Sequence, residues 1–371
     1  MSKIDNAMRD DNAHMARALQ LAEQGLMSAA PNPRVGCVLV KDGVVIAEGW
    51  HIVTGGAHAE IHALQQAKEH ARGATAYVTL EPCSHHGRTA PCCDALINAG
   101  IVRMVYGMQD PNPLVAGRGL QKLREAGIVV DGAVLEVQSR ALNPGFVKRM
   151  QQNLPFVRLK MAMSLDGRTA MASGESQWIT GEHARRDVQC LRARSCAIVT
   201  GSGTALHDNA ALTVREPALV EALGARRPLR VLLDTAARLP ISADIFSAAA
   251  PTLWCTGSAA PTHLPSTLQY WQAPLTEGRI DLRALLTELA HRHVNEVLVE
   301  AGATLAGAFL QAKLVDEIMV YIAPKLLGSA ARPLFMLPFE QMAQTMDVEV
   351  VDIRAVGKDW RVTARPVYSP I

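Results

Sequence analysis

The stretch from residue 58 to residue 93 reads HAEIHALQQAKEHARGATAYVTLEPCSHHGRTAPCC. We consider three of its side chains as a ligand set: the imidazole of His58, the thiol of Cys83 and the thiol of one of the neighbours Cys92 and Cys93. One His and two Cys ligands fill three positions of a tetrahedral zinc ion and leave the fourth for water, as in catalytic zinc sites. The stretch therefore predicts a catalytic zinc centre.

Glu60 indicates which reaction this zinc centre catalyses. A zinc-bound water becomes hydroxide near neutral pH and can attack a ring carbon that carries an amino group. Glu60, which follows His58 by two positions, can then pass the proton to the departing ammonia. A His-x-Glu motif followed by Pro-Cys and a further Cys is the signature of zinc deaminases, in which the Glu is an acid/base group and not a ligand. We therefore predict hydrolytic deamination of an amino-substituted pyrimidine ring, with Glu60 as catalytic residue.

The helix that carries His58 and Glu60 must begin irregularly. Residues two apart on a regular helix do not face the same way, so the two side chains converge only at a distorted helix entry. The pair Gly55-Gly56 just before it makes such an entry plausible.

The sequence motif alone does not identify the third metal ligand. Cys92 and Cys93 cannot both point comfortably at one metal, and His85 and His86 are further candidates in the loop between the cysteines. That loop, residues 84–91, is longer than the usual C-x-x-C spacing of zinc deaminases. We expect it to carry a feature of the substrate pocket.

Strands alternate with helices through the first half, which predicts a sheet covered on both faces. A hairpin is expected where the apolar runs 35–40 and 44–49 flank Lys41-Asp42-Gly43. The expected helices are 13–24, 58–70, a helix after Pro91, and 118–126; the further expected strands are 76–80, 102–106 and 128–130.

A second α/β domain is expected after a boundary near residues 143–154. Asn143-Pro144-Gly145 ends one pattern, and the polar run 148–153 precedes a new strand. We place the domains at 1–147 and 148–371. The expected strands are 156–163, 197–200, 229–233, 252–255 and 296–300, the helices are 182–192, 281–291 and 305–311, and β-like runs follow at 318–322 and 348–353.

Length and composition favour two globular domains and a small substrate. A chain of 371 residues exceeds the size at which one hydrophobic core usually stops growing. The net charge of +2 is spread without the lysine and arginine clusters that nucleic acids or anionic membranes require. The polar start lacks a signal-peptide core, and no later apolar run is long enough to span a bilayer. We expect a cytoplasmic protein that binds neither membrane nor nucleic acid.

The motifs resemble those of the bifunctional deaminase/reductase family of riboflavin biosynthesis, over nearly the whole chain. In the first half the matching segments are Pro31-Asn32-Pro33-Arg34-Val35-Gly36, His58-Ala59-Glu60, residues 81–89 through Cys92, Asp110-Pro111-Asn112-Pro113 and Gly117-Arg118-Gly119. In the second half they are residues 160–168 and 174–180. The resemblance makes the long loop between the cysteines a family trait and implies that Cys92, with His58 and Cys83, holds the zinc. Cys93 is then expected to be a packing residue.

The resemblance also implies the fold and the reactions. A cytidine-deaminase-like α/β/α domain would precede a dihydrofolate-reductase-like α/β domain. The first would deaminate 2,5-diamino-6-(5-phosphoribosylamino)pyrimidin-4(3H)-one with one zinc ion per chain. The second would use NADPH to reduce the ribosyl chain of the product, 5-amino-6-(5-phosphoribosylamino)uracil, to the ribityl form. A homo-oligomer is expected.

By position, the resemblance implies two sets of residues in the second half. The substrate-contacting residues are Ser176, Arg192, Leu212, Arg215 and Glu300. The cofactor-contacting residues are Ala162, Trp178, Thr204, Asp208, Gly302, Ala303, Thr304, Leu305, Ala306, Gly307 and Ala308. Two of the family's usual prolines are replaced by alanine. Ala90 is expected to alter the stiffness of its loop more than the chemistry, and Ala210 is expected to affect the path of the loop before Leu212.

Some sequence features support cofactor binding independently of the family resemblance. An apolar strand at 297–300 leads into Ala301-Gly302-Ala303-Thr304 at a helix start, where backbone amides can face a phosphate. No G-x-G-x-x-G follows an expected strand, so a standard Rossmann fingerprint is absent. Arg192 and Arg215 offer planar guanidinium groups suited to the substrate's phosphate.

Two other functions compete with this interpretation. A base deaminase acting on tRNA or DNA is disfavoured because basic and aromatic residues are not interleaved. A structural zinc module joined to a nucleotide-binding regulatory domain would need a fourth protein ligand, and Glu60 would then have no role.

Overall fold

The computed structural model describes residues 3–84, 91–113, 115–259, 264–265 and 268–368. The chain divides into two compact units, Met1–Asn153 and Leu154–Ile371. Among the described residues, no helix combines the length and the apolar character needed to cross a membrane.

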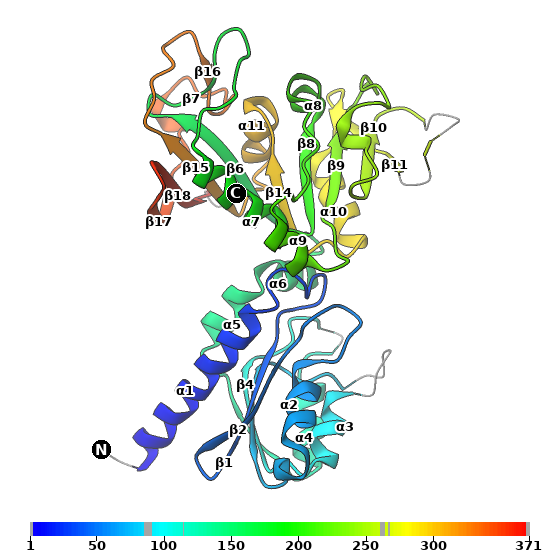
Figure 1. The fold of residues 1–371 in the computed structure, drawn as a ribbon, viewed down its shortest axis with the longest axis vertical. Helices are drawn as coiled ribbons and strands as arrows, with labels where there is room; N and C mark the ends of the chain where they lie inside the picture. The colour runs from blue at the N-terminus through cyan, green and yellow to red at the C-terminus, as the bar shows by residue number, and fades with distance from the viewer. Residues whose placement is uncertain (1–2, 85–90, 114, 260–263, 266–267, 369–371) are drawn as a thin grey trace. The chain divides into compact units, whose positions relative to one another are not determined.

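A five-stranded sheet forms the centre of the first unit (Figure 1). Its order is β2-β1-β3-β4-β5; β1 pairs antiparallel with β2 and β3, and β3, β4 and β5 run parallel. The elements of this unit are α1 (Lys3–Glu23), β1 (Gly36–Lys41), β2 (Val44–Trp50), α2 (Ala59–Ala67), η1 (Lys68–Ala71), β3 (Thr75–Leu80), α3 (Cys92–Asn98), β4 (Arg103–Met108), α4 (Arg118–Glu125), β5 (Val129–Gly132), α5 (Glu136–Leu142) and α6 (Pro144–Gln152).

Helices cover both faces of this sheet, which confirms the predicted arrangement. On one face α1 packs Met15 and Leu21 against Val38 and Val105 of the strands. On the other face α2, α3 and α4 bury small and apolar side chains against the same strands. Two helix starts, those of α2 and α3, therefore lie on one side of the sheet. They carry the predicted metal ligands His58 and Cys92, and the third, Cys83, follows β3.

The second unit contains a nine-stranded sheet of order β11-β10-β9-β8-β14-β6-β15-β18-β17. The strands from β11 to β15 are parallel to their neighbours, and β18 and β17 continue the sheet antiparallel. The elements of this unit are β6 (Phe156–Ser164), β7 (Arg168–Ala170), α7 (Glu182–Arg194), β8 (Ala197–Gly201), α8 (Ser202–Asp208), α9 (Pro217–Leu223), β9 (Leu229–Leu233), η2 (Asp244–Phe246), β10 (Thr252–Thr256), β11 (Leu268–Gln272), β12 (Leu275–Thr276), β13 (Arg279–Ile280), α10 (Leu282–His291), β14 (Glu296–Glu300), α11 (Ala303–Gln311), β15 (Glu317–Ala323), β16 (Arg332–Pro333), η3 (Met342–Gln344), β17 (Val348–Val356) and β18 (Asp359–Pro366).

The two faces of the parallel strands carry different helices. Val157 and Val299 face the core that α10 and α11 complete. Leu298 and Tyr321 face α7 instead. Because side chains alternate along a strand, the residues of β6 and β14 that point toward α7 include the polar ones at positions 158, 160, 296 and 300.

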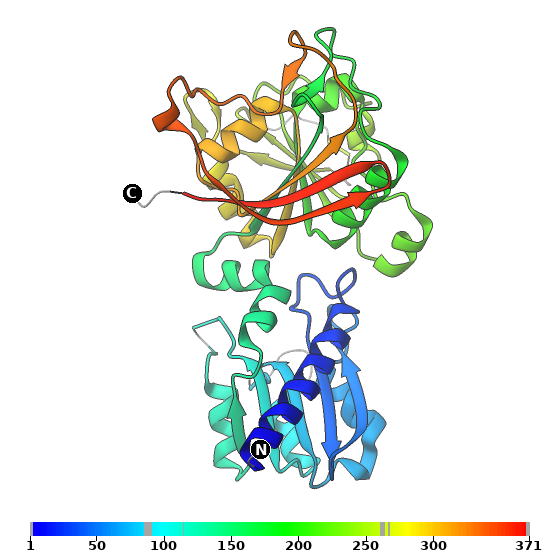
Figure 2. The same cartoon turned by 90° about the vertical axis from the view of Figure 1, so that its left-hand side faces the viewer.

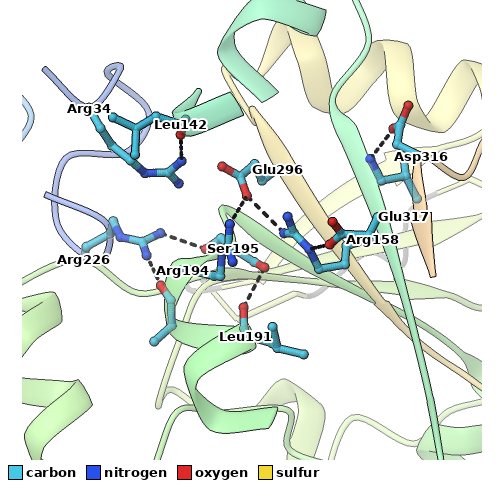
Figure 3. A network of polar contacts seen from close by, with 12 residues as sticks. Arg34, Leu142, Arg158, Leu191, Arg194, Ser195, Arg226, Glu296, Asp316 and Glu317 are labelled. Carbon is cyan, nitrogen blue, oxygen red and sulfur yellow. Dashed lines mark hydrogen bonds and ion pairs between the residues drawn. The ribbon is translucent and has the colours of Figure 1, made fainter. Parts of the chain in front are cut away.

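Arg158 locks the register of the three central strands (Figure 3). Its guanidinium donates to Glu296 on β14 at 3.1 Å and to Glu317 on β15. Arg194, at the end of α7, lies 3.9 Å from the same Glu296 carboxylate. Removing one partner of such a buried group leaves an uncompensated charge, so the network fixes how β6, β14 and β15 align.

The region expected to link the domains is helical. Pro144 occupies the first turn of α6, where its missing N–H costs no hydrogen bond, and the polar run 148–153 forms most of this helix. Helices α5 and α6 were not predicted because their polar sequences resemble a linker. The hydrogen bond from Arg34 to the carbonyl of Leu142, at 2.6 Å, ties α5 to the loop before β1 (Figure 3).

Candidate metal centre and ligand cavity

Three side chains of the first unit converge on one point. Nδ1 of His58 lies 3.2 Å from Sγ of Cys92 and 3.7 Å from Sγ of Cys83, and the three ligand atoms are all within 4.8 Å of one another. A tetrahedral zinc ion with Zn–N of about 2.0 Å and Zn–S of about 2.3 Å separates its ligand atoms by about 3.6 Å. The donor set and its spacing therefore fit zinc.

The helix entry that brings His58 and Glu60 together is irregular, as expected. His58 is the N-cap of α2 and has an extended backbone, with φ −77° and ψ 166°, while Glu60 lies in the first helical turn. The positive φ of Gly55, 83°, turns the chain into this entry. The Glu60 side chain is buried, and burial raises the pKa of its carboxyl group. A carboxyl group in this state can hold a proton next to the metal ligands.

The two neighbouring cysteines point in different directions. The backbone N–H of Cys92, the first residue of α3, donates to Sγ of Cys83 at 3.3 Å. The side-chain hydrogen bonds from Cys92 and His58 lower the pKa of Cys83 and favour the thiolate that a metal requires. The thiol of Cys93 instead lies 3.4 Å from the carbonyl of Pro82 and belongs to the hydrophobic core. The structure thus brings Cys92, and not Cys93, to the cluster.

Glu81 organises the loop beside this centre, a role that the sequence did not reveal. Its buried carboxylate accepts hydrogen bonds from the backbone N–H groups of Asp110, Gly117 and Gly119 at 3.2, 2.9 and 2.9 Å. A side chain at Gly119 would collide with the carbonyl of Pro82, 2.1 Å from an added Cβ. The family motif around residue 117 is therefore a folded loop held by Glu81.

His51 and Asn32 form a second polar pair near the metal ligands that sequence reasoning missed. The carbonyl of Ala57 accepts from Nδ1 of His51 at 3.0 Å, so Nε2 is the acceptor for the Asn32 amide at 3.1 Å. Burial lowers the pKa of His51 and so favours the neutral form of the ring. Its ring packs edge-on against that of His58, with centroids 5.5 Å apart. The only signal in the sequence was that Asn32 belongs to a family motif.

Some predicted features lie outside the described residues. His85 and His86, named as further candidate ligands, and Ala90, named for its effect on the loop, all belong to residues 85–90.

The second unit contains a cavity of about 1430 Å³ along the carboxyl ends of its parallel strands. All five residues expected to contact substrate line it: Ser176, Arg192, Leu212, Arg215 and Glu300. Of the residues expected to contact the cofactor, those that line it are Ala162, Trp178, Thr204, Asp208, Gly302, Ala303, Thr304, Leu305 and Ala308. Ala306 is instead buried in the core of the unit, and Gly307 packs against the backbone of Met336.

One end of this cavity holds a buried charge cluster. Arg192 donates to both oxygens of Glu300, at 2.6 and 3.0 Å, and Nζ of Lys160 lies 3.9 Å from the same carboxylate. Lys160 and Glu300 are register partners on β6 and β14, and α7 supplies Arg192 from above the same face. Burial would raise the pKa of Glu300, but the charge and hydrogen bonds of Arg192 and the charge of Lys160 together outweigh burial and lower this pKa.

Lys160 is the residue of this cluster to which the sequence assigned no role. It lines the cavity, and burial lowers the pKa of its amine. A lysine with a lowered pKa can exchange its proton nearer to neutral pH than an exposed lysine can. The cluster therefore provides a fixed carboxylate and an amine able to transfer a proton.

The opening of α11 fits the phosphates of a dinucleotide. Gly302 is its N-cap, with an extended backbone, and Gly302, Ala303 and Thr304 all face the cavity. Free backbone N–H groups at the start of a helix attract anions. Trp178 lies at the cavity wall with Arg185 over its ring at 4.7 Å. The cavity thus combines an anion site, an aromatic face and a charge cluster.

Both halves of the chain match known protein families. Residues 8–108 match the cytidine and deoxycytidylate deaminase zinc-binding region, and residues 155–362 match the RibD C-terminal domain. The riboflavin biosynthesis protein RibD of Escherichia coli is 52% identical over 357 residues, which cover 94% of this chain and 97% of that protein. The same protein of Haemophilus influenzae is 46% identical over 96% of this chain and 97% of its own length.

Solved structures agree over nearly the full length. A structure of Acinetobacter baumannii RibD has a TM-score of 0.91 and 44% identity, and it covers 97% of this chain and 100% of its own. A Thermotoga maritima diaminohydroxyphosphoribosylaminopyrimidine deaminase/5-amino-6-(5-phosphoribosylamino)uracil reductase has a TM-score of 0.88 and 34% identity, with the same coverage. We predicted a cytidine-deaminase-like α/β/α domain followed by a dihydrofolate-reductase-like α/β domain. The matches confirm this fold class, with a deaminase-like α/β domain followed by an α/β reductase domain of the RibD type.

Identity at this level, over both halves and alongside a zinc-binding deaminase region and a reductase domain, confirms the predicted family. The chain belongs to the riboflavin biosynthesis protein RibD family, and it is a bifunctional enzyme that joins a zinc-dependent deaminase to an NADPH-dependent reductase.

Proposed function

We propose that the first domain deaminates 2,5-diamino-6-(5-phosphoribosylamino)pyrimidin-4(3H)-one and that the second reduces the ribosyl chain of the resulting 5-amino-6-(5-phosphoribosylamino)uracil. The observation that carries this proposal is the cluster of His58, Cys83 and Cys92 beside the buried Glu60. The Thermotoga maritima relative, whose name describes these two activities, supports the choice of substrate.

The test is a two-stage assay of the full chain with zinc. Without NADPH, the diamino compound should release ammonia and change mass by the replacement of an amino group with oxygen. With NADPH, the product should also gain two hydrogens while NADPH absorbance falls. Ammonia release from an RNA or DNA oligonucleotide, and none from the diamino compound, would favour a nucleic-acid deaminase instead.

In the deaminase, the proposed zinc ligands are His58, Cys83 and Cys92. Zinc, when bound there, activates a water molecule for attack on the amine-bearing carbon. Glu60 takes the proton of the attacking water and delivers it to the leaving amine, so that water and the amino compound become the oxo compound and ammonia. Its buried position keeps bulk water from competing for that proton.

In the reductase, we propose that Lys160 and Glu300 act at the sugar. NADPH, when bound, supplies the hydride that reduces C1′ of the ribose. Lys160 supplies the proton that the sugar ring oxygen needs as the ring opens. Glu300, which is held by Arg192, positions the amine of Lys160. Because Arg192 is already paired with Glu300, Arg215 is the better placed of the two to bind the substrate's phosphate.

We propose that the cavity divides between the two ligands of the reductase. The substrate residues are Ser176, Arg192, Leu212, Arg215 and Glu300; the NADPH residues are Ala162, Trp178, Thr204, Asp208 and the segment 302–308. Within that segment, Ala306 and Gly307 would act by letting α11 pack closely, because neither lines the cavity.

Metal analysis should separate the two neighbouring cysteines. Cys83→Ser is expected to lose most of its zinc, because a hydroxyl is a poor substitute for a thiolate ligand. Cys93→Ser should keep about one zinc per chain, since its thiol faces the core. Undiminished zinc in the first variant would remove Cys83 from the ligand set, and loss of zinc from folded Cys93→Ser would show that the wrong neighbour was assigned.

NADPH should stabilise the second domain against heat. A ligand that binds only the folded state at one hundred times its Kd adds about 2.7 kcal/mol to the free energy of unfolding. The melting temperature should therefore rise with NADPH concentration. The fluorescence of Trp178, which lines the cavity, should also change, and this change should be lost in Trp178→Phe. If saturating NADPH alters neither signal, the second domain does not use this cavity for the cofactor.

We also propose a functional boundary at 147/148, within α6, so that 1–147 carries the deaminase and 148–371 the reductase. The location we propose is the cytoplasm. The described structure leaves all seven cysteines without disulfide partners, which is the usual state of thiols in a reducing compartment.

We propose that the protein is a homo-oligomer that pairs through β17 and β18. Strand β17 is the edge of the nine-stranded sheet, and Figure 2 shows it with β18 as a long ribbon. Exposed apolar side chains lie along this ribbon: Val348, Val350, Val351, Ile353 and Trp360. An open edge strand offers unpaired backbone groups to a second chain, and exposed apolar side chains add surface that such a contact can bury.

Light scattering after size exclusion tests this proposal. The wild type should have at least twice the 39.9 kDa mass of one chain, and Ile353→Glu should shift it toward a single chain. Val137→Glu, which changes an exposed valine on α5, should leave the mass unaltered. A wild type that stays monomeric at high micromolar concentration would contradict the proposal.

A further inference from the structure

The reductase cavity extends across the parallel strands β15, β6, β14, β8 and β9. Lys160 on β6 and Glu300 at the end of β14 mark one end, and the segments after β8 and β9 mark the other. The carboxyl ends of parallel strands share one edge of a sheet. Neighbouring strands are about 4.8 Å apart, so three steps from β6 to β9 cover about 14 Å. A long ligand can therefore run along this edge from the charge cluster to β9.

The orientation of a bound dinucleotide follows from this layout. The nicotinamide ring must lie near Lys160 and Glu300, where the sugar is reduced, and the start of α11, after β14, takes the pyrophosphate. The adenosine half is then directed toward β8 and β9. NADPH and NADH differ only in a phosphate on the adenosine ribose, so a residue that distinguishes them must lie at this far end.

Arg238 is a cation that follows β9 at this end of the cavity. It lines the cavity, its side chain is 61% exposed, and its Nη2 donates to the hydroxyl of Ser202 at 2.9 Å. Ser202 follows β8 and Arg238 belongs to the loop after β9, and the strand ends Gly201 and Leu233 are register partners. The guanidinium and the hydroxyl are thus held side by side and face the cavity.

An acidic residue, Asp234, also follows β9, and a carboxylate in this position can indicate a preference for NADH. In dinucleotide sites a carboxylate binds the free 2′-hydroxyl of NADH, whereas an arginine accommodates the 2′-phosphate of NADPH. Asp234, however, is fully buried and is not part of the cavity wall, and its carboxylate accepts from the backbone N–H of Leu239 at 2.9 Å. Its other oxygen lies 4.0 Å from Nε of Arg238. Asp234 therefore shapes the loop and orients Arg238.

We infer that Arg238, with the hydroxyl of Ser202, binds the 2′-phosphate of NADPH and makes the reductase prefer NADPH to NADH. The inference rests on the proposed use of this cavity by the cofactor. A planar guanidinium suits a phosphate because two of its N–H groups can donate to phosphate oxygens at once.

Calorimetric titration without substrate tests the inference on the full-length, zinc-loaded protein. The probes are NADPH, NADH, 2′,5′-ADP and 5′-AMP. The wild type should bind the two 2′-phosphorylated compounds more tightly than their counterparts. Arg238→Ala should weaken the binding of NADPH and 2′,5′-ADP by about 10- to 100-fold and leave the binding of NADH and 5′-AMP nearly unchanged. Arg238→Lys should retain part of the preference through its charge.

Arg279 provides a matched comparison, because it is another arginine of the cavity wall. Arg279→Ala should change NADPH and NADH affinity by the same factor, if at all. Equal loss of both dinucleotides in Arg238→Ala, or loss of the preference only in Arg279→Ala, would overturn the assignment of Arg238. A wild type that binds none of the four probes would instead contradict the cofactor site of the proposed function.

Discussion

Glu60→Ala is expected to abolish ammonia release while zinc remains bound. The substitution removes the group that moves protons between water and amine, and it leaves His58, Cys83 and Cys92 in place. Loss of a positioned acid/base group typically costs about 10²- to 10⁴-fold in rate, and the upper part is expected because one residue serves several transfers. The measurements are ammonia release from the diamino substrate and zinc content of the purified variant.

The reductase provides the internal control for this variant. NADPH oxidation should vanish when the diamino substrate is supplied and persist when the deaminated aminouracil phosphate is supplied, because the second site lies in the other unit. Glu60→Gln, which keeps the size of the side chain but cannot carry the proton, should behave in the same way. Ammonia release near the wild-type rate with zinc bound would refute the mechanism. Loss of both reactions in a folded protein would refute the separation of the sites.

The metal centre was predictable because its ligands carry chemistry that the sequence displays. His58 and Cys92 are at the starts of α2 and α3, and Cys83 follows β3, so ordinary strand and helix patterns place all three at one edge. The irregular entry was also foreseen, because residues two apart on a helix cannot converge. The choice between Cys92 and Cys93 needed the family resemblance, because the orientation of α3 decides which of the two thiols faces the metal site.

The charge cluster of the reductase could not be predicted in the same way. Lys160 and Glu300 meet because β6 pairs with β14 in one register, and that pairing joins distant parts of the chain. Arg192 was expected to bind phosphate, since nothing local shows that Glu300 will occupy its guanidinium. The strands β9 and β14 were predicted with their observed bounds because each contains a run of three apolar residues and lies inside the sheet. Strand β18 was missed because polar residues interrupt it.

Lys160→Met should stop reduction and leave deamination intact. Lys160 lies 3.9 Å from Glu300, lines the cavity and has a pKa that burial lowers, so its proton is available for the sugar oxygen. Glu300 keeps its two hydrogen bonds from Arg192 in the variant, so the fold should tolerate the change. We expect NADPH oxidation with the aminouracil phosphate to fall by about 10²- to 10⁴-fold, while ammonia release and NADPH binding by calorimetry stay near wild type.

Lys160→Arg and the dependence on pH distinguish proton transfer from charge alone. Arginine keeps the positive charge beside Glu300 but does not give up a proton in this pH range, so Lys160→Arg should be nearly as inactive as Lys160→Met. The reaction needs protonated Lys160, so the wild-type rate should fall as the pH rises through the lowered pKa of this residue. Any activity left in Lys160→Arg should lack this decline. Full activity of Lys160→Arg would show that only the positive charge matters. If the residual rate of Lys160→Arg declined with pH as the wild-type rate does, the proton would come from another group.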